Sequence, residues 1–119
     1  MILIVDDSTT NQVLLEAILQ EEGYETVTAF SAKEAFKLVE KHKPKLILLD
    51  LLMPEVSGFD FLKELKGNKK TSNTPVIVVS AVESRENVDI CMQYGAADFI
   101  GKPIDIALFL SKVKQTMLS

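Results

Sequence analysis

The sequence of 119 residues predicts one α/β domain built on a doubly wound, five-stranded parallel sheet. Two patterns lead to this prediction. Short apolar runs of strand length recur five times, and each is followed by a segment whose apolar residues have helical spacing. Strands that alternate with helices form parallel sheets, because each crossover helix returns the chain to the same end of the sheet. No repeat, low-complexity tract or linker interrupts residues 1–119, so we expect a single domain.

Capping residues locate the first two helices. Ser8 follows the apolar run 2–5, and a serine side chain at this point can accept a backbone N–H of the first helical turn. Gly23 is predicted to follow the end of this helix, because glycine is common just after helix C-termini. Ser31 and Glu34 have the spacing of a capping box. The elements expected in this part of the chain are strands at 2–5, 25–29 and 46–49, and helices at 9–22 and 32–41.

The second half of the chain continues the alternation. Ser84 and Asp105 can each cap a further helix, and Gly95 ends the first of these two. The elements expected here are helices at 59–66 and 85–94, strands at 76–79 and 99–100, and a last helix that begins after Asp105.

Apolar residues at helical spacing predict the buried face of each helix. Cys91, on the fourth helix, is expected to be a small core residue. The other expected core residues are Val13, Leu14, Ala17 and Ile18 in the first helix, Phe59, Leu62 and Leu65 in the third, and Leu108, Phe109 and Val113 in the last.

The composition restricts the classes of function. A formal net charge of −4 argues against nonspecific nucleic-acid binding, which depends on clustered Lys and Arg. One cysteine and one histidine exclude an internal disulfide, disfavour a zinc site and suit a reducing cytoplasm. No apolar run reaches the roughly 18 residues of a membrane span, and the N-terminal strand lacks the basic residues of a signal peptide. A strand that begins at residue 2 also suggests a chain trimmed from something longer.

Polar residues follow four of the five predicted strands. Asp6 and Asp7 follow the first strand, Asp50 the third, Ser80 the fourth and Lys102 the fifth. Ligands of such sheets bind beyond the C-terminal ends of the strands. Three carboxylates, one hydroxyl and one amine should therefore meet at one end of the sheet.

The three carboxylates expected at this end would repel one another. Two unit charges about 4 Å apart cost roughly 4 kcal/mol at an effective dielectric constant near 20. A divalent cation relieves this repulsion, and ligands that offer only oxygen favour Mg²⁺. With the Lys102 ammonium beside it, such a cation forms a site for a phosphoryl group. Asp50 can then act as a nucleophile and become an aspartyl phosphate, while Ser80 hydrogen-bonds a phosphate oxygen.

Each of these residues also has a plainer interpretation. Asp6 and Asp7 could be an acidic pair at a helix N-terminus, a position worth about 0.3–1 kcal/mol. Lys102 could be a surface lysine, and Ser80 an ordinary hydroxyl at a strand end. An idle carboxylate at Asp50 is costly, because it directly follows a run of four apolar residues. The presence of all five residues together favours the metal and phosphoryl site.

The chain resembles the receiver domain of two-component response regulators. Each short motif is weak alone, whereas the whole set on the expected elements is highly specific. The family has a CheY-like, flavodoxin-like (βα)5 fold with strand order 2-1-3-4-5, and that order is expected here. The resemblance also implies a cis peptide bond before Pro103. It covers the whole chain and rests on residues with the family's spacing, namely Asp6-Asp7, Asp50, Met53-Pro54, Gly58, Ser80-Ala81 and Lys102-Pro103.

The resemblance implies a role for each charged residue of the set. Asp50 is the expected phosphoacceptor. Asp7, Asp50 and the backbone carbonyl of Leu52 are expected to ligate Mg²⁺, for which Mn²⁺ or another divalent cation could substitute. Asp6 is expected to act mainly through a metal-bound water. Lys102 is expected to pair first with Asp50 and then with the phosphate.

Two further residues are implied to act as a switch. Ser80 is expected to move toward the phosphoryl group, and Phe99 matches the family's switch aromatic, although it could also be an ordinary core residue. Phosphorylation is then expected to change the partner affinity of the face formed by the fourth helix, the fifth strand and the fifth helix, through which two copies could also dimerise. The first helix near Asn11 and Leu14, together with the Pro103 loop, is the expected kinase-docking surface.

The expected function is a cytoplasmic signalling switch that catalyses no reaction other than its own phosphorylation and dephosphorylation. A sensor histidine kinase or a histidine phosphotransfer domain would supply the phosphoryl group, and a downstream effector domain or protein would respond. No output segment follows Ser119, so the target is either a docked partner or a domain of a longer protein. Two alternatives stay open. An unphosphorylated pseudo-receiver usually lacks one of the five residues, and an aspartyl-nucleophile phosphatase of the haloacid dehalogenase type would need an aspartate in place of Leu52.

We predict slow self-dephosphorylation of the aspartyl phosphate. In the family, the positions two residues after the phosphoacceptor and two after the switch hydroxyl influence hydrolysis, and here they are Leu52 and Val82. Neither side chain can orient an attacking water. The measurement follows the phosphoprotein over time in Mg²⁺ after removal of the phosphodonor. Rapid decay without a phosphatase would contradict the prediction.

Overall fold

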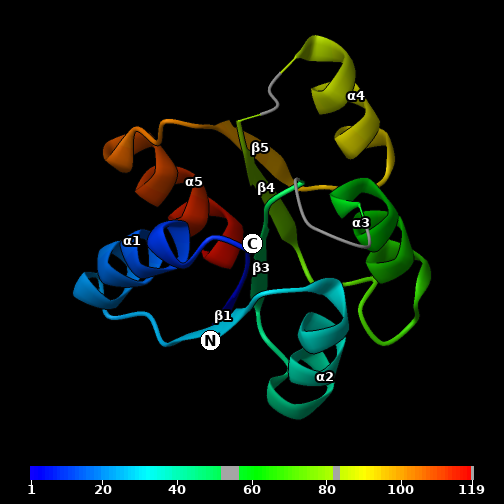
Figure 1. The fold of residues 1–119 in the computed structure, drawn as a ribbon, viewed down its shortest axis with the longest axis horizontal. Coiled ribbons are helices and arrows are strands. Elements are labelled where there is room, and N and C mark those ends of the chain that lie inside the picture. Colours follow the sequence, from blue (N-terminus) through cyan, green and yellow to red (C-terminus); the bar gives the residue numbers. More distant parts are fainter. Residues whose placement is uncertain (52–56, 82–83, 119) are drawn as a thin grey trace.

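The structure is a parallel sheet with helices on both faces (Figure 1). The computed structural model describes residues 1–51, 57–81 and 84–118. The five strands are all parallel and lie in the order β2-β1-β3-β4-β5, which confirms the predicted doubly wound fold and its strand order. The strands are β1 (Ile2–Val5), β2 (Thr26–Ala29), β3 (Leu46–Leu49), β4 (Val76–Ser80) and β5 (Asp98–Gly101).

Five helices connect and cover these strands, and their N-caps follow from the sequence. Ser8, Ser31, Ser84 and Asp105 are the predicted caps, and each side chain accepts the backbone N–H three residues later. Ser57 caps α3 in the same way, which the prediction missed because it began that helix at residue 59. In the described part of the chain, no helix has both the length and the apolar character needed to cross a membrane. The helices are α1 (Thr9–Glu21), α2 (Ala32–His42), α3 (Gly58–Gly67), α4 (Arg85–Gln93) and α5 (Ile106–Leu118).

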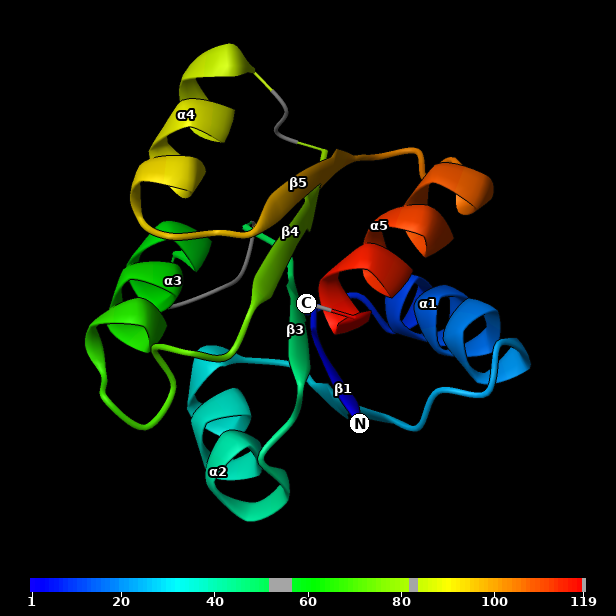
Figure 2. The same cartoon turned by 180° about the vertical axis from the view of Figure 1, so that it is seen from behind.

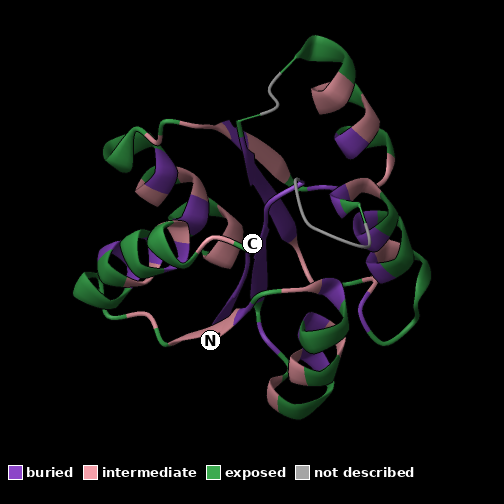
Figure 3. Cartoon of the chain, viewed as in Figure 1, coloured by how far each residue is buried: buried purple, intermediate pink, exposed green. Residues whose placement is uncertain are grey.

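The strands β1, β3 and β4 bury both of their faces, and alternate residues of each strand point to opposite sides of the sheet. One set packs beneath α2, α3 and α4 and the other beneath α1 and α5, and Figure 2 shows these two groups of helices on opposite sides. Figure 3 shows the central strands β1, β3 and β4 as the most continuously buried part of the molecule, whereas the edge strands β2 and β5 are mostly half-buried. Polar groups can therefore collect only at the ends of the strands. The strand residues of the first core are Leu3, Val5, Ala29, Ile47, Leu49, Val76 and Val78, and those of the second are Ile2, Ile4, Leu46, Leu48, Ile77, Val79 and Ile100.

The buried face of α1 differs from the predicted one. Val13 and Leu14 are 58% and 47% exposed, and Ala17 is also exposed. Apolar residues surround most of this helix, so their spacing alone does not select one face. Packing of α1 against the sheet makes the selection. The buried residues are Gln12, Leu15, Ile18 and Leu19.

Smaller differences of the same kind occur in α3 and α5. Phe61 is fully buried, whereas the predicted core residue Phe59 is half-buried. The Phe61 ring meets the Phe36 ring edge-on at 4.9 Å between centroids, a contact across two helices that the spacing within α3 does not reveal. Leu108 in α5 is 49% exposed. The other core residues predicted in these two helices are buried, as is Cys91 in α4.

Gly58 allows a close approach between α3 and the chain that leaves β3. A Cβ atom at this position would lie 2.4 Å from the Leu51 Cα and 2.8 Å from the Asp50 carbonyl oxygen. The Gly58 N–H donates to the Leu51 carbonyl oxygen at 3.0 Å. The start of α3 therefore packs directly against the backbone beside Asp50, and only glycine leaves room for this contact.

Replacement of Gly58 by alanine is expected to destabilise the fold. The added methyl group would overlap backbone atoms, which cannot move aside without displacing α3. Overpacking of this kind should lower the free energy of unfolding by about 1–3 kcal/mol. Urea unfolding followed by circular dichroism measures the change.

Gly67→Ala is the matched control, because Gly67 ends the same helix and nothing lies within 4 Å of a Cβ atom placed there. We expect this variant to be neutral or slightly more stable, since alanine favours helices over glycine by up to about 1 kcal/mol. Equal losses in the two variants would contradict the close approach at Gly58.

Candidate functional site

Two carboxylates lie side by side where the strands end, at what we call the carboxyl end of the sheet. Val5 pairs with Leu49, so the residues that follow them, Asp6 and Asp50, are neighbours. The Asp50 N–H donates to the Val5 carbonyl oxygen at 2.9 Å. Both residues are buried, Asp6 with 2% and Asp50 with 7% of its surface exposed. The register between β1 and β3 thus brings two acids together in a buried corner.

Lys102 neutralises part of this charge. Its ammonium donates to Asp6 Oδ2 and to Asp50 Oδ2, each at 3.2 Å. Lys102 follows β5, which lies beyond β4 and is two strand spacings, or about 10 Å, from β3. A long side chain is therefore needed to cross β4 and contact both carboxylates.

Asp7 completes an acidic cluster with Asp6 and Asp50. One carboxylate oxygen from each residue lies within 4.8 Å of the others, and Asp7 is the exposed member. When ionised, these three carboxylates and the Lys102 ammonium carry a formal charge of −2. A divalent cation would cancel this charge, and an all-oxygen set is the kind that Mg²⁺ prefers. The residues present therefore fit a divalent cation.

Burial raises the pKa of Asp6 above its ordinary value of 3.8. Desolvation is the main cause, because it disfavours the charged carboxylate, and the negative charge of Asp50 acts in the same direction. The Ser8 backbone N–H, which donates to Asp6 Oδ1 at 2.9 Å, and the Lys102 ammonium lower the pKa but do not offset the burial. The ionised Asp6 is thus held in the fold at a cost in stability.

Ser80 and Phe99 lie on the two strands beyond Asp50. Ser80 is the last residue of β4 and is fully buried, and its carbonyl oxygen accepts the Lys102 backbone N–H at 3.1 Å. Phe99 is half-buried in β5 and packs against the core beneath α2, α3 and α4. The hydrogen bond between Ser80 and Lys102 connects the predicted switch residue to the lysine that holds both carboxylates.

Several predicted residues lie outside the part of the chain that the structure describes. They are Leu52, with its predicted carbonyl ligand, Met53, Pro54 and Val82. The Lys102–Pro103 peptide bond is cis, as the resemblance implied. The structure brings Asp6, Asp7, Asp50 and Lys102 together, and the chemical roles of these residues stay predictions.

Gln12 is a residue near the site that the sequence prediction missed. Its buried Nε2 donates to the carbonyl oxygens of Asp6 and Ala29, each at 2.8 Å, and so joins α1 to the ends of β1 and β2. A signal was present, because Gln12 has helical spacing with Leu15 and Leu19, and a polar residue on a buried stripe needs hydrogen-bond partners. Gln12 is therefore placed to hold the backbone at Asp6.

The chain is similar over most of its length to known proteins. A family model described as the response regulator receiver domain matches residues 2–114. The polar-differentiation response regulator DivK of Brucella ovis is 35% identical over 113 residues, which are 95% of this chain and 92% of that protein. The signal receiver domain of a signal transduction histidine kinase from Syntrophus aciditrophicus has a TM-score of 0.89 at 36% identity, over 98% of this chain and 89% of that one. A CheY-like response regulator receiver domain protein from Methanospirillum hungatei has a TM-score of 0.89 at 31% identity, over 98% and 91%.

Asp6→Asn is expected to raise the free energy of unfolding of the metal-free protein at neutral pH. The folded-state pKa of Asp6 lies above 3.8, so between 3.8 and that pKa the native state binds more protons than the unfolded state. Stability therefore falls as the pH rises through this window, and the loss is complete above it. The neutral amide avoids this loss. Urea unfolding in EDTA at several pH values measures the difference, which should disappear below pH 3.8.

Asp7→Asn is the matched control for this prediction. Asp7 carries the same charge at the next position but is exposed, so its replacement should change the free energy of unfolding by no more than about 0.5 kcal/mol. A loss of stability in Asp6→Asn at neutral pH would contradict the prediction, because it would show that the ion pair with Lys102 outweighs the cost of burial.

Proposed function

The chain belongs to the family of response regulator receiver domains, and on this basis we propose that it is a phosphorylation-driven switch. Receiver domains work with kinases and effectors in two-component systems, and in general they are signalling modules and not enzymes. In this chain, Asp50 would take a phosphoryl group from a partner phosphohistidine. The observation that carries the proposal is the contact of one ammonium, that of Lys102, with both Asp6 and Asp50 in a buried corner.

Asp50 is the member of the acidic cluster best suited to be the nucleophile. Asp6 lies deeper, with 2% of its surface exposed against 7% for Asp50. Asp7 is exposed to water, which screens its charge. Asp50 follows the central strand β3, between β1 and β4, so groups from both neighbouring strands converge on it.

In the proposed reaction, a carboxylate oxygen of Asp50 attacks the phosphorus atom in line with the P–N bond of the donor phosphoimidazole. The new O–P bond forms as the P–N bond breaks, and the electron pair of the broken bond stays on the imidazole nitrogen, which takes up a proton. The Lys102 ammonium orients the Asp50 carboxylate and then donates to a phosphoryl oxygen. The Ser80 hydroxyl donates to another of these oxygens.

A divalent cation completes this proposal. The residues that would hold it are Asp6, Asp7 and Asp50, with the Leu52 carbonyl as a further predicted ligand. Mg²⁺, or Mn²⁺ in its place, would supply positive charge to the transferring phosphoryl oxygens. Asp6 and Asp7 supply negative charge for this cation, because the Lys102 ammonium neutralises the charge of only one of the three carboxylates.

The proposed switch extends from the phosphorylated carboxylate to the face of α4, β5 and α5. A phosphoryl group adds negative charge and acceptor oxygens beside Ser80. The Ser80 carbonyl oxygen on β4 accepts the Lys102 backbone N–H, and Phe99 lies on β5, three residues before Lys102. On α5, the Lys112 ammonium contacts Asp98 Oδ1 at 2.9 Å and the Phe99 carbonyl oxygen at 3.4 Å. A shift of β5 would therefore reach α5, and we propose this face for effector binding and for the pairing of two copies.

We propose that the phosphodonor protein docks on α1 and on the connection from β5 to α5. Leu14, which is 47% exposed, lines a hollow of about 270 Å³ with Asn11, Lys102 and Pro103. This exposed apolar side chain lies on the α1 face that the sequence had predicted to be core. A partner seated there would cover the side of the site that leads to Asp50.

Asp50→Asn is expected to abolish phosphorylation. The amide is not nucleophilic, so incubation with acetyl phosphate and Mg²⁺ should add one phosphoryl group to the wild-type protein and none to the variant. Intact-protein mass and Phos-tag mobility measure the product. EDTA should abolish labelling of the wild type. A variant labelled to the same extent as the wild type would overturn the assignment of Asp50.

The control variant is Asp89→Asn, on the exposed face of α4 and outside the acidic cluster, which should be labelled like the wild type. A wild-type protein that is never labelled, by acetyl phosphate or by a phosphorylated kinase, would support the pseudo-receiver alternative. Turnover of p-nitrophenyl phosphate would support the phosphatase alternative, and we expect none.

A further inference from the structure

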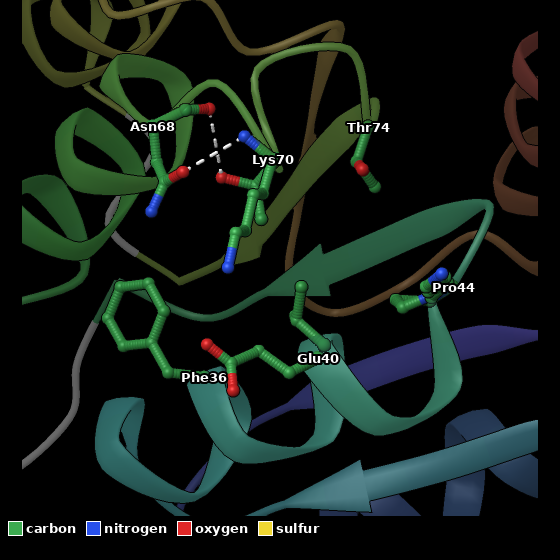
Figure 4. Close-up of a pocket in the computed structure, with 9 residues that line it drawn as sticks. Phe36, Glu40, Pro44, Asn68, Lys70 and Thr74 are labelled. Carbon is green, nitrogen blue, oxygen red and sulfur yellow. Dashed lines mark hydrogen bonds between the residues drawn. The ribbon is translucent and has the colours of Figure 1, made fainter.

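A second concave site lies at the opposite end of the sheet from Asp50. It is a cavity of about 680 Å³ between residues 36–44, at the end of α2, and residues 68–74, in the loop from α3 to β4 (Figure 4). We call it the α2–loop pocket. Pro44 leads into β3 and Thr74 leads into β4, so both walls lie where these strands begin. Small-molecule sites usually have volumes of about 300–1,000 Å³, and this pocket has that size.

The α2 wall supplies the apolar surface of the pocket. Phe36 and Val39 line it, and Pro44 follows at the end of the helix. The Phe36 ring is held by its edge-on contact with Phe61. Phe36 is half-buried, so part of its side chain faces the cavity and offers a flat apolar surface.

The loop wall is stiffened by its own hydrogen bonds. Asn68 Oδ1 accepts the Lys70 N–H at 2.9 Å, and the Asn68 carbonyl oxygen accepts the Ser72 N–H at 2.7 Å. The Lys66 ammonium donates to the Thr74 carbonyl oxygen at 2.9 Å. A wall that is already ordered loses little conformational entropy when a ligand binds.

Three charged side chains line the pocket, and they form no ion pairs with one another. Figure 4 shows Lys70 pointing from the loop toward Phe36 and Glu40, and Lys43 caps the end of α2. Within residues 1–51, 57–81 and 84–118, no carboxylate lies within 4.0 Å of either ammonium. Two ammonium groups and one carboxylate leave the lining positive in a chain whose net charge is −4. Such a local reversal of charge favours an anionic ligand.

We propose that the α2–loop pocket binds a small anion that carries a flat aromatic group. The anionic group lies against the ammonium groups of Lys43 and Lys70, and the aromatic group lies against Phe36. Glu40 is the one acid of the lining. Its carboxylate accepts a hydrogen bond from an anionic ligand that carries an N–H or O–H donor, and it repels an anionic ligand that has no such donor. A mononucleotide and an aromatic carboxylic acid both have this chemistry.

NMR titration of the ¹⁵N-labelled protein tests the proposal. The titrations are made in EDTA without a phosphodonor. Phenylphosphonate has both the anionic and the aromatic group, whereas inorganic phosphate has only the anionic group and benzyl alcohol only the aromatic group. Amide shifts should gather at residues 36–44 and 68–74, and phenylphosphonate should bind about tenfold more tightly than either partial probe. AMP and 4-hydroxybenzoate distinguish the two sources of ligand. Shifts centred on Asp6 and Asp50, or no saturable shift with any of these compounds, would overturn the proposal.

Two neighbouring lysines of the loop provide a matched pair of variants. Lys70 lines the pocket and Lys69 does not. Lys70→Ala should weaken phenylphosphonate binding about tenfold, and Lys69→Ala should leave it unchanged. Glu40→Gln should tighten it, because a repulsive charge is removed. Equal effects of the two lysine variants would overturn the site. Asp50→Asn should bind as the wild type does, so failure of this pocket and failure of the phosphoacceptor assignment are distinguishable.

Discussion

The ion pairs that the Lys102 ammonium makes with Asp6 and Asp50 organise the carboxyl end of this sheet. Two buried acids at the ends of neighbouring strands repel each other strongly in a medium of low dielectric constant, and removal of the Lys102 ammonium would take away the positive charge that contacts both of them. Backbone register sets this geometry, since β1 pairs with β3 so that the two acids emerge together. The lysine arrives from β5, two strands away from β3, and only a long side chain covers that distance.

The Lys102 ammonium neutralises only part of the negative charge of the carboxylates, and this suits a site that accepts further positive charge. The pKa of Asp6 is raised by burial in spite of the ammonium, and three carboxylates against one ammonium leave a deficit of positive charge. The apolar cores on both faces of the sheet stabilise the fold enough to hold this unfavourable corner. Gly58 and Gln12 contribute in another way, because each fixes backbone next to an acid of the cluster.

The two ends of the sheet have opposite character. At the carboxyl end the connections present acids, whereas at the other end the lining of the α2–loop pocket is positive. The same strands, β3 and β4, run between the two ends, with Asp50 and Ser80 at one and the connections through Pro44 and Thr74 at the other. This segregation of charge arises from the connecting segments, because β3 and β4 carry no charged residue.

Short-range chemistry accounts for what could be predicted from the residues alone. The apolar runs, the serine caps and the polar residues that follow the strands are local signals, and they yield the parallel sheet, the element boundaries to within a few residues and the meeting of Asp6, Asp7, Asp50 and Lys102. Contacts between elements account for the rest. The buried face of α1, the role of Gln12 and the contact between Phe36 and Phe61 depend on which surfaces the folded chain brings together. A helix that is apolar on most sides has no preferred face until it meets a sheet, and a pocket between α2 and a distant loop has no counterpart in local sequence.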